Sequence, residues 1–105
     1  EEFVIILPVF GIDGGTRVAE RIRKKVEKTQ VQFTHKGVKT SISVTVSLGV
    51  SDLFNYKSSN GEISKIVELA DKALYKAKES GRNCIFSAKE NPQTKEIILA
   101  PFITP

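Results

Sequence analysis

The stretch SISVTVSLGV, residues 41–50, decides the class of fold because apolar and small residues alternate along all of it. Isoleucine, valine or leucine occupies every second position from Ile42 to Val50, and serine, threonine or glycine fills the positions between them. In a β-strand, successive side chains point to opposite faces. The stretch therefore predicts one continuous strand with an apolar face and a face of small residues. We expect a closely packed helix, rather than a ligand, on the small-residue face.

The residues before this strand predict a hairpin. Val31–His35 is a second strand-like stretch, and Lys36-Gly37 separates it from the run that begins at Val38. Glycine tolerates the positive φ angle that a tight two-residue turn requires. Residues 31–50 are therefore predicted to form two adjacent antiparallel strands joined by this turn.

A helix is predicted before the hairpin, over residues 14–29. Val18, Ile22 and Val26 recur at helical spacing and form one apolar stripe. Asp13 is the expected N-cap, because its side chain can accept a hydrogen bond from a free N–H of the first turn.

A second helix is predicted after the hairpin. Ser59 and Glu62 have the spacing of a capping box, which marks a helix start. Gly81 is expected to end the helix in a left-handed conformation. Apolar residues at helical spacing occupy one face between these signals, at Ile63, Ile66, Val67, Ala70, Leu74 and Ala77.

Two further strands complete the predicted order. The continuous apolar run FVIIL, residues 3–7, is typical of a strand that is covered on both faces in the middle of a sheet. Residues 83–86 are predicted to form a last short strand. The order strand, helix, hairpin, helix, strand predicts an α/β domain built on a mixed sheet with flanking helices.

The length and composition fit a soluble globular domain with one hydrophobic core, since the chain has 105 residues of which 40% are hydrophobic. No domain boundary is visible before about residue 89. Residues 1–88 are therefore predicted to form one unit, and residues 89–105 a C-terminal tail to which the sequence assigns no role. The sequence contains no methionine and opens close to a strand-like run. We therefore expect it to be a piece of a longer protein.

Charge and cysteine content exclude several classes of protein. The net charge of +4 is concentrated in residues 17–28, but this run holds no aromatic residue to stack on bases, so we predict no nucleic-acid partner. The longest early uncharged run, residues 3–12, is too short to span a membrane, so we predict no membrane contact. A single cysteine, Cys84, cannot form an internal disulfide. These features favour a cytoplasmic protein.

Three sequence words carry a resemblance to a known family. They are EEFVIILP at residues 1–8, VTVSLGVS at residues 44–51 and ADKALYKAKESGRN at residues 70–83. In this order and spacing they resemble the GGDEF family of diguanylate cyclases, whose signature is Gly-Gly-Asp/Glu-Glu-Phe on a β-hairpin. Glu1, Glu2 and Phe3 match the last three letters of that signature, and the resemblance covers roughly the first 86 residues. Both glycines are absent, as are the family's earlier metal-binding aspartate, its guanine-reading residues and its Arg-x-x-Asp inhibitory site.

The resemblance implies a fold and a reaction. The fold would be a ferredoxin-like mixed sheet of the nucleotidyl-cyclase palm type, with residues 1–88 as the second half of the domain. The reaction would join two GTP molecules into cyclic di-GMP with release of two pyrophosphates. It would require a homodimer, because each half-site attacks the α-phosphate held by the other. The family also implies an upstream sensory or receiver domain.

The resemblance also implies roles for individual residues. Glu1 would coordinate Mg²⁺ and help to activate the attacking 3′-hydroxyl, and Glu2 would support the metal site. The family uses two Mg²⁺ ions per active site, and Mn²⁺ is a possible substitute. Lys78 and Arg82 match the pair of cations that contact the triphosphate. These residue types suit phosphoryl transfer, which relies on positioning and charge neutralisation.

The same residues also fit roles without catalysis. A lysine in the last turn of a helix, such as Lys78, complements the helix dipole without any ligand. For the whole domain, the alternative is a catalytically inactive GGDEF domain that serves as a GTP-binding or protein-interaction module. A third interpretation is an unrelated structural domain of similar topology. An intact Gly-Gly pair and a metal-binding aspartate upstream would favour the enzyme.

Overall fold

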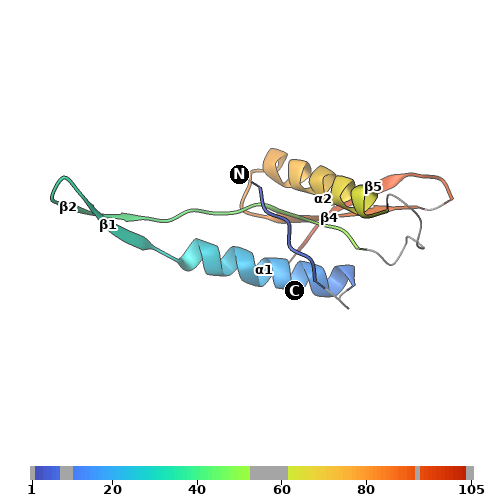
Figure 1. Cartoon of the computed structure of the whole chain (residues 1–105). Helices are drawn as coiled ribbons and strands as arrows, with labels where there is room; N and C mark the ends of the chain where they lie inside the picture. The colour runs from blue at the N-terminus through green and yellow to red at the C-terminus, as the bar shows by residue number, and fades with distance from the viewer. Residues whose placement is uncertain (1, 8–10, 53–61, 92, 104–105) are drawn as a thin grey trace.

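The computed structural model describes residues 2–7, 11–52, 62–91 and 93–103. Its elements follow in the order α1 (Ile12–Lys28), β1 (Val31–His35), β2 (Val38–Ile42), β3 (Leu48–Val50), α2 (Glu62–Glu79), β4 (Ile85–Glu90) and β5 (Ile97–Pro101). Both helices pack on the sheet of β3, β4 and β5. We call this sheet together with α1 and α2 the body, and the β1–β2 hairpin projects from it (Figure 1). The molecule is elongated, with principal extents of 60 × 29 × 23 Å. No helix in the described ranges has the length and apolar character that crossing a membrane requires.

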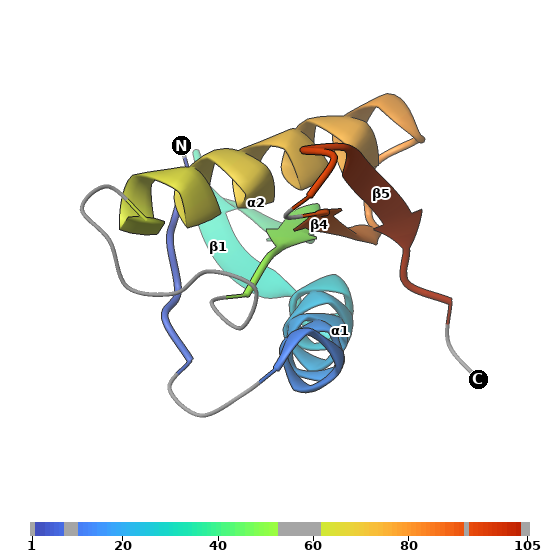
Figure 2. The same cartoon turned by 90° about the vertical axis from the view of Figure 1, so that its right-hand side faces the viewer.

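The body is built on a three-stranded mixed sheet of order β3-β4-β5. β3 pairs with β4 in parallel, and β4 pairs with β5 in antiparallel orientation. A parallel pair needs a long crossover connection, and the segment that contains α2 supplies it. α2 covers one face of the sheet and α1 the other, as Figure 2 shows. The predicted α/β class, with a mixed sheet and flanking helices, is confirmed, although the hairpin forms a separate two-stranded sheet.

The small-residue face of the central stretch is explained at β3. A Cβ atom on Gly49 would collide with the carbonyl oxygen of Ala70, so only glycine fits beneath α2. The next residue, Val50, faces the other helix, and its Cγ1 lies 3.1 Å from where a Cβ would stand on Gly15 of α1. Alternation along β3 therefore brings one helix to each face. The prediction of a closely packed helix on the small-residue face is confirmed at this position.

The core lies between α2 and β4. Its buried side chains are Leu69, Ala73 and Ala77 from α2 with Phe86 and Ala88 from β4, and Cys84 and Ile97 pack against them. Alanines on the helix let its backbone approach the sheet closely, while Leu69 and Phe86 fill most of the volume. Ser59 of the predicted capping box lies outside the described residues, so that start signal stays a prediction.

The predicted hairpin is confirmed, but the single continuous strand after it is not. β1 and β2 pair in antiparallel orientation, and the turn residues Lys36 and Gly37 have φ angles of 52° and 79°. β2 ends at Ile42 and β3 begins at Leu48, and residues 43–47 pair with no strand of the described chain. The alternating pattern indicates two faces, but a neighbouring strand is needed to make a ladder. β2 pairs with β1 and β3 pairs with β4, so the strand divides where neither neighbour reaches.

The prediction that the apolar run at residues 3–7 forms a central strand is wrong. Residues 2–7 have no regular secondary structure, and Phe3 and Ile6 are 85% and 81% exposed. A central strand needs a neighbour along each edge and a covering layer on each face. The described residues provide neither to this segment. The side chains of residues 3–6 are therefore exposed to solvent, and Leu7 is half-buried.

α1 begins at Ile12, before its predicted start, and is capped differently. The residue before it is Gly11, which has no side chain to cap the helix, and Asp13 lies inside the first turn instead of at the N-cap. The N–H of Ile12 donates to Oδ2 of Asp52 at 3.1 Å. The helix is therefore capped by a residue that follows β3, and this bond also ties α1 to the sheet.

The C-terminal part of the chain adds a strand that the sequence did not predict. β4 begins at Ile85, later than the strand predicted at residues 83–86, because Asn83 lies in a turn. β5 pairs along β4 from Glu90 to Phe86, and the Phe102 N–H donates to the Ile85 carbonyl oxygen at 2.9 Å. The segment with no assigned role thus covers the outer edge of β4. The predicted boundary between residues 88 and 89 stays a prediction.

Candidate functional site

The predicted cations lie where α2 ends. Gly81 has a φ angle of 108° and ends the helix in the left-handed conformation that the sequence predicted. The N–H of Arg82 donates to the Ala77 carbonyl oxygen at 3.0 Å, which is the closing bond of a Schellman motif. This bond fixes the backbone of Arg82 against the last helical turn, which carries Lys78.

Glu2 and Lys78 lie far apart in the sequence but come together in the fold. The Nζ atom of Lys78 lies 3.6 Å from Oε2 of Glu2, and the two side chains are 39% and 61% exposed. In Figure 1 the start of the chain lies beside the C-terminal end of α2. An ion pair this exposed contributes about 0–1 kcal/mol to stability. The Lys78 ammonium group therefore stays accessible to a more highly charged anion.

Arg82 extends into solvent from the same turn. Its side chain is exposed, its φ angle is 65°, and its guanidinium has no hydrogen-bond or ion-pair partner among the described residues. Both cations lie at the C-terminal end of a helix, where the partial negative charge of the carbonyl groups disfavours an anion. An anion bound here would therefore depend on both. The structure brings Glu2 and Lys78 into contact but shows no contact from either to Arg82 in the described chain.

Asn83, which was not among the predicted site residues, holds this turn in place. Asn83 has a φ angle of 51°, and its Oδ1 accepts a hydrogen bond from Nη1 of Arg23 at 2.9 Å. Its Nδ2 donates to Oε2 of Glu27 at 2.5 Å, and its backbone N–H donates to Oγ of Ser47 at 3.1 Å. The signal that could have found it is the residue type, because asparagine tolerates the left-handed region.

Arg23 is itself firmly held on α1. Its Nε and Nη2 atoms donate to the two carboxylate oxygens of Glu20 at 2.6 and 3.2 Å. Its Nη1 also lies 3.5 Å from Oε2 of Glu27. The hydrogen bond to Glu20 raises the pKa of Arg23 above its ordinary value, and the negative charges of Glu20 and Glu27 add to this while burial opposes it. Arg23 is therefore a permanent cation between two carboxylates and an amide.

The described residues supply only part of what a metal site needs. They contain no group of three or more His, Cys, Asp or Glu side chains placed to hold a metal ion. Mg²⁺ usually binds through one or two carboxylates together with substrate phosphates and water. The exposed carboxylate of Glu2 fits that chemistry as one donor. Glu1, the predicted metal ligand, lies outside the described residues, so its role stays a prediction.

The family to which the chain belongs follows from its match to a known domain model. The model of the diguanylate cyclase GGDEF domain matches residues 1–84. The chain belongs to the GGDEF domain family. The match extends from the signature residues Glu1 and Glu2 through Lys78 and Arg82, and the resemblance seen in the sequence is confirmed. The described body is a partial domain of this palm-type α/β fold.

Individual relatives support the same family. The chain is 41% identical over 91 residues to Diguanylate cyclase A of Treponema denticola, which covers 87% of this chain and 23% of the relative. It is 35% identical over 83 residues to Diguanylate cyclase DosC of Escherichia coli, covering 79% and 16%. It is 40% identical over 91 residues to an uncharacterized protein of Bacillus subtilis, YhcK, covering 86% and 24%. The chain thus spans less than a quarter of the length of these relatives. No solved structure matches it.

Proposed function

We propose that the chain is part of a diguanylate cyclase domain and carries its triphosphate-binding cations and its signature carboxylates. Within a longer protein, the domain condenses two GTP molecules into one cyclic di-GMP and two pyrophosphates. In each step a ribose 3′-oxygen loses its proton and bonds to the α-phosphorus of the other GTP, and the bond from that phosphorus to pyrophosphate breaks. Each GTP is both attacking and attacked, so two half-sites must face each other. A homodimer provides this arrangement.

The ion pair between Glu2 and Lys78 is the observation that supports this proposal most directly. Glu2 belongs to the signature at the start of the family match, and Lys78 lies near its end. Their charged groups are nevertheless 3.6 Å apart. Phosphoryl transfer needs carboxylates that hold metal beside cations that hold phosphate. The contact at the end of α2 likewise places a carboxylate, that of Glu2, beside a cation, that of Lys78.

In the proposed site, each residue has a separate task. Lys78 and Arg82 bind the triphosphate through charge-assisted hydrogen bonds and neutralise charge on the departing pyrophosphate. When Lys78 turns to the triphosphate, it releases Glu2, whose carboxylate then supports the metal site. Glu1, by family resemblance, holds the metal and helps to activate the 3′-hydroxyl. When bound, Mg²⁺ would neutralise phosphate charge and act as a Lewis acid. An upstream sensory or receiver domain and a cytoplasmic location stay predictions of the sequence.

The test is product formation by the full-length protein that contains this chain. Incubation with GTP and Mg²⁺ is expected to yield cyclic di-GMP, which mass spectrometry identifies. Glu1→Gln is expected to reduce turnover by more than about 100-fold without loss of folding, because it removes a charge from the site and keeps the side-chain volume. The 105-residue chain alone is expected to make no product, because by family resemblance it lacks the earlier metal-binding aspartate and the guanine-reading residues.

Two results would contradict the proposal. If the full-length protein binds GTP but makes no cyclic di-GMP, the alternative of a catalytically inactive regulatory module is favoured. If the Glu1→Gln variant keeps near-normal turnover at limiting Mg²⁺, Glu1 is not the metal ligand. Circular dichroism of both proteins checks that the substitution leaves the fold unchanged.

A further inference from the structure

The turn after α2 has a backbone conformation that Arg82, at its centre, does not favour. Gly81, Arg82 and Asn83 follow one another with φ angles of 108°, 65° and 51°. Glycine adopts such angles freely and asparagine tolerates them, but other residues with a Cβ atom disfavour them. Arg82 is of this last kind and lies between Gly81 and Asn83, so the turn gains from support outside it. The hydrogen bonds of Asn83 provide it.

Asn83 is held at three atoms by two other parts of the chain. Arg23 and Glu27, one turn apart on α1, bind the oxygen and the nitrogen of its side-chain amide. Ser47, just before β3, accepts the hydrogen bond of its backbone N–H. The amide cannot rotate without breaking both bonds to α1. The turn that carries Arg82 is therefore clamped to the helix on the opposite face of the sheet.

Every nitrogen of the Arg23 guanidinium already has a partner within the protein. Two of its nitrogens are bonded to Glu20, and the third is bonded to Asn83 and lies beside Glu27. Its side chain is only 14% exposed. Arg23 is therefore placed to hold Asn83, not to contact phosphate.

We propose that Arg23 and Asn83 are positioning residues for triphosphate binding, which act by fixing the backbone from which Arg82 reaches the nucleotide. This inference rests on the proposed function, because it requires that Arg82 bind the triphosphate. The Arg82 guanidinium has no partner among the described residues, so within that part of the chain the position of Arg82 is fixed through its backbone. Pre-ordering that backbone lowers the entropy cost of binding GTP. Neither positioning residue touches the reacting atoms, so the effect falls on KM more than on kcat.

Two substitutions in the full-length protein test the clamp. Asn83→Gly keeps the left-handed backbone without strain and removes both bonds to α1. Arg23→Gln removes the bond from Arg23 to the amide oxygen and leaves the bond between the amide nitrogen and Glu27. Each is expected to raise the KM for GTP by about two- to tenfold, the effect of one or two lost hydrogen bonds, with kcat within about twofold of the wild type. Lys24→Gln is the matched control, because Lys24 pairs with the same Glu20 at 3.7 Å but does not contact Asn83, and its KM is expected to be unchanged.

A double-mutant cycle with Arg82→Ala separates this inference from the proposed function. If Asn83 acts through Arg82, then Asn83→Gly raises KM no further once Arg82 is alanine. Effects that multiply would overturn the positioning role, because Asn83 would then act by another route. An Arg82→Ala variant with normal GTP affinity would instead overturn the triphosphate assignment itself.

A second measurement needs no nucleotide and no turnover. Hydrogen–deuterium exchange of residues 80–84 is expected to be faster in Arg23→Gln and in Asn83→Gly than in the wild type, and unchanged in Lys24→Gln. The melting temperatures of the three variants show whether a slower enzyme is merely less folded. Unchanged exchange in both clamp variants would overturn the inference, since the turn would then hold its shape without α1.

Discussion

The end of α2 and the N-terminal segment, residues 2–7, lie beside each other but are held in different ways. The end of α2 belongs to the body, where Ala77 and Phe86 are buried and Asn83 is clamped to α1. The N-terminal segment pairs with no described strand, and Phe3 is 85% exposed. The described fold therefore fixes the cation side of the candidate site, and it leaves the carboxylate side to one exposed ion pair.

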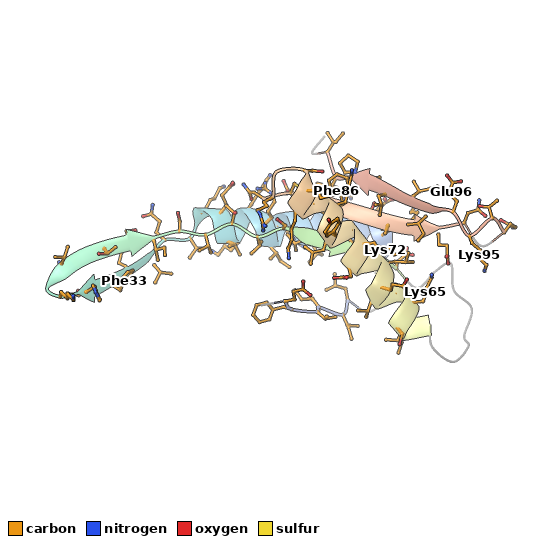
Figure 3. All side chains as sticks on the ribbon, turned by 90° about the horizontal axis from the view of Figure 1, so that it is seen from above. Phe33, Lys65, Lys72, Phe86, Lys95 and Glu96 are labelled. Atoms are coloured by element: carbon orange, nitrogen blue, oxygen red, sulfur yellow. The ribbon has the colours of Figure 1, made fainter. Side chains whose placement is uncertain are left out.

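The largest expected effect is on the free energy of unfolding, which should depend on the packed end of α2 and not on the N-terminal segment. Phe86→Ala removes a buried ring from the core beneath α2 and is expected to lower the free energy of unfolding by about 3–5 kcal/mol. Phe3→Ala removes an exposed ring of the same size and is expected to change it by less than about 0.5 kcal/mol. Denaturant unfolding of the 105-residue chain measures both. Figure 3 shows the matching contrast between Phe86 in the body and Phe33 on the projecting hairpin, which is 44% exposed.

Equal effects of Phe86→Ala and Phe3→Ala would break the comparison. A large loss of stability in Phe3→Ala would mean that the N-terminal segment is packed in solution. A small loss in Phe86→Ala would mean that the core between α2 and β4 contributes little to stability.

Two local signals in the sequence predicted local features correctly, whereas the predicted N-cap Asp13 lies inside the first turn of α1. The hairpin turn at Lys36 and Gly37 and the helix stop at Gly81 depend on backbone preferences of single residues, which any sequence displays directly. Gly49 could be placed beneath a helix because a face of small residues permits close approach. The class of fold followed from the order of these elements.

Features that depend on distant partners could not be predicted in this way. The apolar run at residues 3–7 has the composition of a central strand, but a strand also needs a neighbour, and composition does not say whether one is present. The bond from Ile12 to Asp52 and the clamp on Asn83 join residues far apart in the sequence. The role of Lys78 and Arg82 came from family resemblance, since charge and spacing alone also fit a helix dipole.

The next prediction tests the cation side of the site. Lys78→Ala and Arg82→Ala in the full-length protein are each expected to weaken GTP binding by about ten- to hundredfold, because each removes charge-assisted hydrogen bonds worth about 1.5–3 kcal/mol. Lys76→Ala is the matched control, because Lys76 is exposed in the same last turn of α2 and complements the same dipole. Calorimetric titration with GTP measures all three variants. Unfolding midpoints are expected to change little in any of them.

Similar GTP affinities of the Lys78→Ala and Lys76→Ala variants would contradict the assignment of Lys78 to the triphosphate. If Lys78→Ala and Lys76→Ala behave alike, with a small loss of stability and normal GTP affinity, Lys78 serves only the helix dipole. Arg82 is the more informative of the two positions. It lies beyond Gly81 and outside the helix, so the helix dipole explains a basic residue there less well than it does at Lys78.

The smallest expected effect tests the weak carboxylate side, and its sign is informative. Without divalent metal, the Glu2 carboxylate competes with the triphosphate for Lys78, so Glu2→Gln is expected to strengthen GTP binding by about two- to fivefold, the scale of an exposed ion pair. This gain should shrink in high salt, because exposed charges are screened. With Mg²⁺ present the sign should reverse, since the proposed support of the metal is lost. Titration with GTP in EDTA and in Mg²⁺ measures both cases, and each titration is repeated in the Lys78→Ala background. In that background the metal-free gain should vanish, because Glu2 no longer has a Lys78 ammonium group with which to pair. A change of the same sign in both conditions would show that Glu2 is a charge partner of Lys78 and takes no part in the metal site.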